Sequence, residues 1–414
     1  MVQANSHDPA EIQRTIQSGA LGDVGWRPGF GCRESSAFGA VCRRFAHQTR
    51  TKSAAICEPV TSVLRSRLQS ENERRAVTAS LVEIETIPKV ELHVHLGGAI
   101  TEATAIELAH RHGVDPLTAL RLIDGRYPGR YRDFPHFLDT YLASNALVTT
   151  PDDLEFVAAR FANQQAAEGI VWTEVIFTAM IYIRNGIEPE AMWRALRDGL
   201  QAGGPETRIG IVVDALCDFG RVEAEATIQL VEEADAPIVG LCLTGIEGTV
   251  PTTDFYLLRE ASTRLGLGFE VHAGEMGPPS SIVEALDVLG ADRIGHGVAA
   301  IRDPELLAPA RSDPGTSRCL SVVERGDRRV SVDRGPPAGR VLAGRVNLTI
   351  SSDDPPFFRT TLTEELRHAV RVAELARRDL AELQRRAARN SFAPPRTRRW
   401  CLDRIDSWDN EATA

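Results

Sequence analysis

The feature that most limits the fold of this chain is a repeated pairing of an apolar, strand-like run with an amphipathic, helix-like run. From about residue 76 the pairing recurs at residues 89–96 with 102–113, 170–180 with 188–204, 208–216 with 222–235, 238–245 with 253–266, 268–275 with 280–290, and 293–297 with 303–310. Apolar strands that are each followed by a helix indicate a parallel sheet covered by helices. A late strand within residues 346–354 brings the count close to eight, so we predict an α/β fold of the (β/α)8 TIM-barrel type rather than an open doubly wound sheet.

Length, charge and cysteine usage narrow the class of protein. The 414 residues suit one barrel-sized domain plus an additional segment. The net charge of −10 argues against a nucleic-acid partner, and no apolar run is long enough to cross a bilayer. The seven cysteines are scattered and form no CxxC pair, so they indicate neither a disulfide framework nor a thiolate zinc site. We therefore expect a soluble, cytoplasmic protein.

Residues 1–75 differ from the rest of the chain. They show no sustained period of 3.6 or 2 and are rich in Gly, Ser, Arg and Cys. We predict a poorly ordered or non-native extension, for which a start codon chosen too early is one explanation. An organelle-targeting peptide is the other explanation, and the acidic residues near the start argue against it. The barrel is then expected to occupy residues 76–414.

The segment ELHVHLGG places two histidines in one apolar run. Side chains alternate between the faces of a strand, so His93 and His95 point the same way. Two neutral imidazoles on one face can bind a metal, but a half-buried strand with a polar face explains the pair equally well. The two glycines that follow, Gly97 and Gly98, are expected to serve the backbone conformation after the strand.

Other strand-like runs also end in residues that an enzyme can use. They are His272 and Glu275 in HAGE, His296 in IGHG, and Asp353 and Asp354 in SSDDPP. In a barrel the strand ends meet at one face, where three histidines and a carboxylate can hold zinc and leave a position open for water. Taken singly, each residue has an ordinary explanation: a core histidine, a carboxylate at a helix start, or a turn. Taken together, in this order, they predict one active site.

Four segments resemble the adenosine deaminase family of amidohydrolase barrels: PKVELHVHLGGAI, HAGE, RIGHG and SSDDPPFFRTTLTEE. The resemblance implies one zinc ion held by His93, His95, His272 and Asp353. It further implies that His296 deprotonates the attacking water, that Glu275 protonates purine N1, that Asp354 bonds N7, and that the Gly245 backbone approaches N3. General acid chemistry supports the role of Glu275, because attack on C6 breaks aromaticity unless a proton reaches the ring nitrogen.

The chain departs from the family pattern at several positions. Gly97 replaces the acidic residue that reaches the sugar in nucleoside deaminases, and Cys242 stands where an acidic residue is common. Residues 131–142 resemble a helical lid, with Phe134 and Phe137 expected to contact the base, although a plain amphipathic helix explains them as well. We predict deamination of a 6-aminopurine nucleoside, with adenosine preferred. Adenine, a modified nucleoside such as aminodeoxyfutalosine, and an inactive purine-binding remnant are the alternatives.

Two other kinds of metal hydrolase do not fit the sequence. Two-metal barrels bridge their metals with a modified lysine on a central strand, whereas the only lysines here are Lys52 and Lys89. Deaminases with an H-x-E and P-C-x-x-C signature are excluded because that cysteine pair is absent. The zinc site is therefore expected to be mononuclear.

Residues 310–345 have an unusual composition for their place in the repeat. Arginines and glycines replace the apolar strand and helix expected there, as in VERGDRRVSVDRGPPAGR. A reading-frame error in a GC-rich gene explains this composition, and a native insertion is the alternative. We predict that all four zinc ligands survive while the seventh strand is poorly formed, leaving the barrel strained or open and the activity low.

Overall fold

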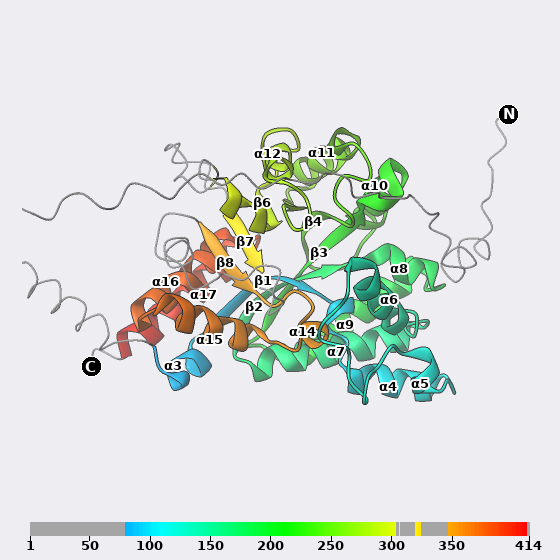
Figure 1. Cartoon of the computed structure of the whole chain (residues 1–414), viewed down its shortest axis with the longest axis horizontal. Coiled ribbons are helices and arrows are strands. Elements are labelled where there is room, and N and C mark those ends of the chain that lie inside the picture. The colour runs from blue at the N-terminus through cyan, green and yellow to red at the C-terminus, as the bar shows by residue number, and fades with distance from the viewer. Residues whose placement is uncertain (1–78, 304–305, 307–318, 324–346, 412–414) are drawn as a thin grey trace, which may run out of the picture. The chain divides into compact units, whose positions relative to one another are not determined.

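The computed structural model describes residues 79–303, 306, 319–323 and 347–411, and it shows the predicted eight-stranded parallel barrel (Figure 1). The strands are β1 (Lys89–His95), β2 (Ile170–Phe177), β3 (Arg208–Leu216), β4 (Ile238–Thr244), β5 (Gly268–Ala273), β6 (Arg293–His296), β7 (Cys319–Val323) and β8 (Leu348–Ser351). The α-helices within these residues are α3 (Leu81–Thr86), α4 (Glu102–Arg111), α5 (Pro116–Ala119), α6 (Phe134–Asn145), α7 (Pro151–Ala167), α8 (Ala179–Arg184), α9 (Pro189–Leu200), α10 (Gly220–Glu232), α11 (Tyr256–Leu265), α12 (Pro279–Asp287), α14 (Pro355–Phe358), α15 (Leu362–Ala373), α16 (Arg377–Asn390) and α17 (Pro395–Glu411). Short 3₁₀ turns are η1 (Gly97–Ala99), η2 (Gln201–Gly203), η3 (Cys217–Phe219), η4 (Thr252–Phe255) and η5 (Val298–Arg302).

The sheet runs in chain order from β1 to β8 and closes on itself. The closing contact is made by Asp353, just beyond β8: its carbonyl accepts a hydrogen bond from His95 N at 2.9 Å, and its N–H donates to His93 O at 3.1 Å. A closed barrel leaves no unpaired sheet edge, and it brings every strand end to the same mouth.

The prediction for the seventh strand was wrong. Strand β7 forms and pairs in parallel with β6, where Arg293 faces Cys319, and with β8, where Leu320 faces Leu348. The physical reason is local, because the sequence CLSVV is apolar enough for a strand and the charged tract begins only after it. The rest of residues 310–345, like the extension 1–75, lies outside the described residues. The reading-frame error and the early start codon therefore stay predictions.

Alternation along the strands divides the core into layers. On β3, Ile211, Val213 and Ala215 face the surrounding helices, whereas Val212 packs with Ile176 and Cys242 inside the barrel. Helices α3, α15, α16 and α17 form a second apolar layer against β1, β2 and β8 (Figure 1). Both faces of the sheet are covered, which explains why the strands read as continuous apolar runs. None of the helices in the described ranges combines the length and the apolar character needed to cross a bilayer.

Candidate active site

The predicted metal and catalytic residues meet at the carboxyl ends of four strands. His93 and His95 lie on β1, His272 on β5, and His296 is the last residue of β6. Asp353 follows β8. All five are held in the mouth of the barrel by the parallel register of the sheet, although they are spread over most of the described chain.

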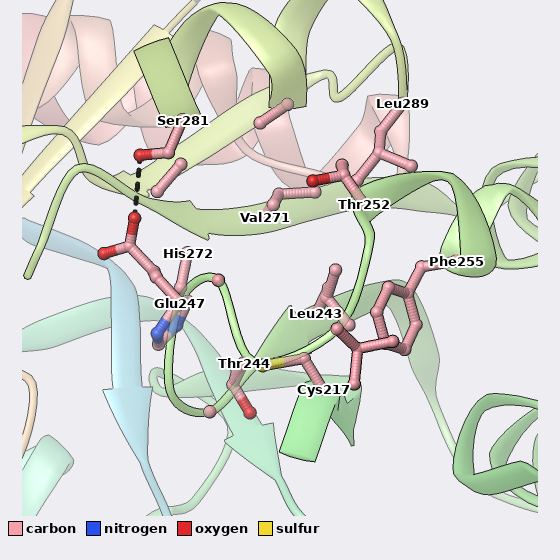
Figure 2. Close-up of a pocket in the computed structure, with 15 residues that line it drawn as sticks. Cys217, Leu243, Thr244, Glu247, Thr252, Phe255, Val271, His272, Ser281 and Leu289 are labelled. Atoms are coloured by element: carbon pink, nitrogen blue, oxygen red, sulfur yellow. Dashed lines mark hydrogen bonds between the residues drawn. The ribbon is translucent and has the colours of Figure 1, made fainter. Parts of the chain in front are cut away.

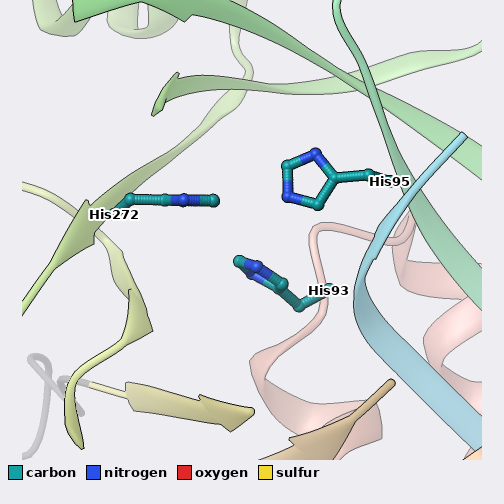
Figure 3. Close-up of side chains that lie close together, drawn as sticks. All are labelled: His93, His95 and His272. Atoms are coloured by element: carbon teal, nitrogen blue, oxygen red, sulfur yellow. The ribbon is translucent and has the colours of Figure 1, made fainter. Parts of the chain in front are cut away.

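Three imidazoles and one carboxylate form a compact set of metal donors. Figure 3 shows the rings of His93, His95 and His272 pointing toward one another, and their nitrogens lie within 4.8 Å. Asp353 Oδ1 lies 3.5 Å from Nε2 of both His93 and His95. The buried Nε2 atoms of His93 and His272 have no hydrogen-bond partner among the described residues. Because uncompensated buried nitrogens are costly, these residues fit a divalent metal with nitrogen and oxygen ligands.

The protonation of the rings agrees with metal binding. Burial lowers the pKa of His95 to about 4 and that of His272 well below its usual value, so both are neutral, as metal ligands must be. His93 differs: burial opposes its charging, but the carboxylates of Glu270 and Asp353 raise its pKa to about 10. The field at His93 thus favours a positive charge on Nε2, and a cation bound there can take the place of the proton.

A buried ion network that the sequence analysis missed orients His93. Glu270 Oε1 accepts a hydrogen bond from His93 Nδ1 at 2.6 Å, which leaves Nε2 for the metal. The same carboxylate bonds Arg293, which also lies 2.7 Å from Glu174. Arg293 and His93 hold the pKa of Glu270 at about 2 against the effect of burial. Both Glu270 and Arg293 are charged residues in short apolar strands, and that is the signal by which sequence reasoning could have found them.

Tight packing and strained backbone mark this part of the mouth. A Cβ atom on Gly295 would lie 2.8 Å from ring atoms of both His93 and His272, so the imidazoles require glycine there. His296 has φ of 66° and Asp353 has φ of 65°, a region that L-residues rarely adopt. Such strain persists only where the surroundings over-determine it, as they do at a functional site.

The predicted acid and base lie beside the metal donors. His296 Nε2 is 3.4 Å from Glu275 Oε2 and 3.2 Å from His272 Nδ1. The side chains of Glu275 and His296 are 8% and 3% exposed. A carboxyl and an imidazole that are close together and shielded from water can exchange protons with one bound substrate.

Glu247 fixes the loop that carries Glu275, and the sequence analysis did not identify it. Its Oε1 accepts hydrogen bonds from the N–H groups of Glu275 at 2.7 Å and Met276 at 2.8 Å, and its Oε2 accepts one from Gly274 N at 2.7 Å. Ser281 Oγ donates a further bond at 2.8 Å, drawn in Figure 2, in a pocket that His272 also lines. These donors lower the pKa of Glu247 although burial opposes them. The loop after β5 is thus tied to the loop after β4.

The two glycines after β1 serve a different purpose from the one predicted. Neither has positive φ, and both are needed because side chains approach closely. A Cβ on Gly98 would lie 1.7 Å from Asp354 Oδ1, and one on Gly97 would lie 2.4 Å from Asn145 Oδ1 and 2.6 Å from the Tyr141 hydroxyl. Asp354 is therefore held against the end of β1, and the ends of the Asn145 and Tyr141 side chains occupy the space beside Gly97.

The remaining predicted substrate contacts lie around the same mouth. Gly245 follows β4 with φ of 102°, and a Cβ there would meet Asp218 Oδ2 at 2.2 Å. Phe137 is buried with Tyr141 and Phe357 in an aromatic cluster at α6, against which Phe134 packs. Helix α6, the predicted lid, begins at Phe134 and is capped by Asp133. Contact of these residues with a purine stays a prediction.

The comparisons with known proteins identify the family. The adenosine deaminase family model matches residues 88–408. The chain belongs to this family. An aminodeoxyfutalosine deaminase of Streptomyces coelicolor is 33% identical over 339 residues, which cover 78% of this chain and 85% of the relative. An adenine deaminase of the same organism is 32% identical over 316 residues, covering 74% and 89%. The crystal structure of an adenine deaminase from Arthrobacter aurescens has a TM-score of 0.69 at 26% identity, covering 80% of this chain and all of that one.

Family membership makes this chain a hydrolase of C–N bonds with a histidine-rich site able to hold a metal. The relatives do not support the preference for adenosine, because they are deaminases of adenine and of aminodeoxyfutalosine. The alternatives weighed from the sequence therefore fit the comparisons better than the first choice does.

Proposed function

We propose that this protein is a zinc-dependent deaminase that converts a 6-aminopurine and water into the 6-oxopurine and ammonia. The observation that carries the proposal is the convergence of four metal donors with Glu275 and His296 in one shielded space. Each of these residues has an ordinary explanation alone, but a histidine cluster with neutral rings at His95 and His272, unpartnered Nε2 atoms at His93 and His272, and an adjacent acid and base fits metal-assisted hydrolysis.

His93, His95, His272 and Asp353 would hold the metal. A bound zinc ion supplies a water whose pKa falls to about 7, so that hydroxide is available at neutral pH. Glu270 keeps the Nδ1 proton of His93 in place. The lack of a thiolate among these donors and the number of imidazoles favour zinc over softer or harder metals.

The chain's own groups move the protons. His296 takes a proton from the attacking water while the oxygen bonds to C6 of the purine. Glu275, protonated beforehand, gives its proton to N1 as C6 becomes tetrahedral. The C6–N bond breaks and the amino group leaves as ammonia after it receives the proton that His296 took from the water, while the remaining hydroxyl proton returns to Glu275 as the C6=O bond forms. With a hydrogen or a sugar on N9, N7 of the purine is an acceptor, so Asp354, pressed against Gly98, would bond N7 through a proton on its own carboxyl.

The substrate is proposed to be adenine or a modified adenine nucleoside rather than adenosine. Two observations support this choice: the relatives act on adenine and aminodeoxyfutalosine, and the end of β1 has no room for a carboxylate that binds a ribose hydroxyl. Removing such a carboxylate removes the hydrogen bond by which a nucleoside deaminase selects its sugar.

The test is metal analysis of the purified full chain together with ammonia release from adenine, adenosine and aminodeoxyfutalosine. We expect one zinc per chain and turnover of adenine or aminodeoxyfutalosine. Zinc without turnover, but with purine binding, would identify a binding protein instead. A metal content that is unchanged in His95→Ala would show that the metal lies elsewhere.

A further inference from the structure

A buried carboxylate on β3 has no place in the chemistry above. Asp214 is 1% exposed and lies on the inner face of the barrel, between Val213 and Ala215, whose side chains face the helices. Its Oδ2 accepts hydrogen bonds from Thr244 Oγ1 at 2.6 Å and Thr178 Oγ1 at 3.1 Å. Its Oδ1 is equally buried and has no partner within the described part of the chain. An unpaired buried acceptor destabilises the fold, which argues for a ligand atom that completes it.

Asp214 belongs to the same mouth as the predicted purine contacts. Thr244, one of its partners, directly precedes Gly245 and lines the pocket beside His272 shown in Figure 2. Tyr141 interacts electrostatically with both Asp354 and Asp214. Burial raises the pKa of its hydroxyl well above the usual value, and both carboxylates add to that rise. The Tyr141 hydroxyl therefore lies within electrostatic reach of Asp354 and of Asp214.

The side of the mouth around Asp214 is otherwise closed by neutral groups. Asn145 accepts a hydrogen bond from the Tyr182 hydroxyl at 3.0 Å and donates one to Gly97 O at 3.3 Å. Those groups are satisfied by one another. Two buried carboxylate oxygens among the described residues of β2, β3 and β4 have no hydrogen-bond partner, Glu174 Oε2 and Asp214 Oδ1, and the first of them is ion-paired with Arg293 at 2.7 Å.

In the proposed pose, with C6 and N1 at His296 and Glu275 and N3 at the Gly245 backbone that follows β4, the N3 and N9 edge of a 6-aminopurine would face β3 and β4. In neutral adenine N9 carries a hydrogen, whereas in a nucleoside N9 carries the sugar. Burial raises the pKa of Asp214 to about 6. At neutral pH the carboxyl is therefore ionised in most molecules and accepts hydrogen bonds. A carboxylate oxygen that lacks a donor thus matches a ring N–H that only the free base offers.

We propose that Asp214 is a specificity residue that accepts the N9–H of a free 6-aminopurine base, so that the preferred substrate is the base and not its nucleoside. This inference rests on the proposed deaminase activity and narrows its substrate class. Thr178 and Thr244 act as positioning residues, because they hold Oδ2 and thereby aim Oδ1.

The test compares adenine with its 9-oxa analogue, in which a ring oxygen replaces N9–H without adding bulk, and with 9-methyladenine. Sites built to bond a substrate N–H reject the analogue lacking it, and for one buried bond we expect a preference of about 10- to 100-fold in kcat/KM for adenine over the 9-oxa analogue. Asp214→Ala should reduce that preference to less than about threefold, mainly by lowering the rate with adenine. Thr244→Val, which removes one hydroxyl from Oδ2 at similar volume, should reduce it partly.

Two controls keep the outcomes separate. Zinc content and thermal unfolding of each variant report whether the barrel is intact, and Asp235→Ala, whose side chain is 95% exposed, should leave the preference unchanged. An unaltered preference in folded, zinc-loaded Asp214→Ala would overturn the inference, as would a wild-type enzyme that turns over adenosine faster than adenine. Absence of turnover with every purine, in contrast, would overturn the proposed function itself.

Discussion

The two halves of the barrel mouth differ in how their polar groups are satisfied. On one half, formed by β1, β5, β6 and β8, charged groups pair with one another and with Glu174 of β2: Arg293 joins Glu270 and Glu174, and Glu270 fixes His93. On the other half, formed by β3, β4, the residue after β2, α6 and the turn after β1, two threonine hydroxyls hold the carboxylate of Asp214. The first half is rigid before any substrate arrives, whereas the second keeps an acceptor for the ligand. In the proposed function, reaction type and substrate choice would be set on opposite sides of one opening.

The largest expected effect comes from the acid on the charged half. Glu275→Gln keeps the shape of the side chain but removes the proton given to N1, so kcat should fall by about 10²- to 10⁴-fold. Zinc content should stay at the wild-type value, because Glu275 is not among the four donors. Steady-state ammonia release and metal analysis measure the two effects. Wild-type turnover in this variant would remove Glu275 from its role.

A change behind the metal donors tests the rigidity of the same half. Glu270→Gln weakens the hold on His93 Nδ1 and leaves Arg293 with one carboxylate instead of two. Orienting partners of this kind are typically worth about 10- to 100-fold in metal affinity. Competition with a chelator should reveal that loss, while Glu284→Gln on the exposed side of α12 serves as the matched control. Equal chelator resistance in both variants would contradict the role of Glu270.

A substitution of Glu247, the carboxylate that holds the loop carrying Glu275, should have a smaller effect. Glu247→Gln puts an amide NH₂ where backbone N–H groups donate, so we expect kcat to fall about tenfold through the loss of a charge-assisted bond. KM and zinc content should change little, since Glu247 lies behind the loop. Ser281→Ala removes one donor only and should cost less than Glu247→Gln. A fall in zinc content equal to the fall in kcat would point to general unfolding instead.

The smallest effect on chemistry is expected at the neutral half. Gly97→Ala forces a Cβ against Asn145 and Tyr141, which should destabilise the fold by about 1–3 kcal/mol through overpacking. Urea unfolding measures this loss, and Asn145→Ala in the same chain should recover part of it. Zinc content and the rate of the chemical step per folded molecule should stay near wild type. A stable Gly97→Ala protein would show that the Asn145 and Tyr141 side chains can move aside, and that a sugar-binding side chain could be accommodated at position 97.

The halves also differ in how far the sequence predicts them. The charged half depends on motifs at strand ends, and the period of 2 along a strand is enough to place His93 beside His95. The neutral half depends on packing between α6 and the end of β1, so the meeting of Asn145 with Gly97 has no local signal. Asp214 stands out as one carboxylate in the apolar run IVVDAL, but its partners became visible only with the register of β2, β3 and β4. Glu247 lies in a loop, where no periodicity applies.

The prediction for the seventh strand shows the limit of composition as a guide. Strand β7 needs only five residues, and these are apolar, while the unusual composition belongs to the chain around them. Averaging over a long segment hid a short element. The parallel barrel tolerates this because a strand is held by its two neighbours, β6 and β8, rather than by the residues that follow it.

The closing contact of the barrel has a consequence for biosynthesis. Asp353 both donates an oxygen near the imidazoles and forms the backbone bonds that join the last strand to the first. While the ribosome is still making β8, a nascent chain already contains His93, His95 and His272 but lacks this residue. With Asp353 as the proposed fourth ligand, full metal affinity would be reached only when the ends of the barrel meet, and metal uptake would report the completion of the ring. A protein truncated before Asp353 should compete poorly for zinc in the cell.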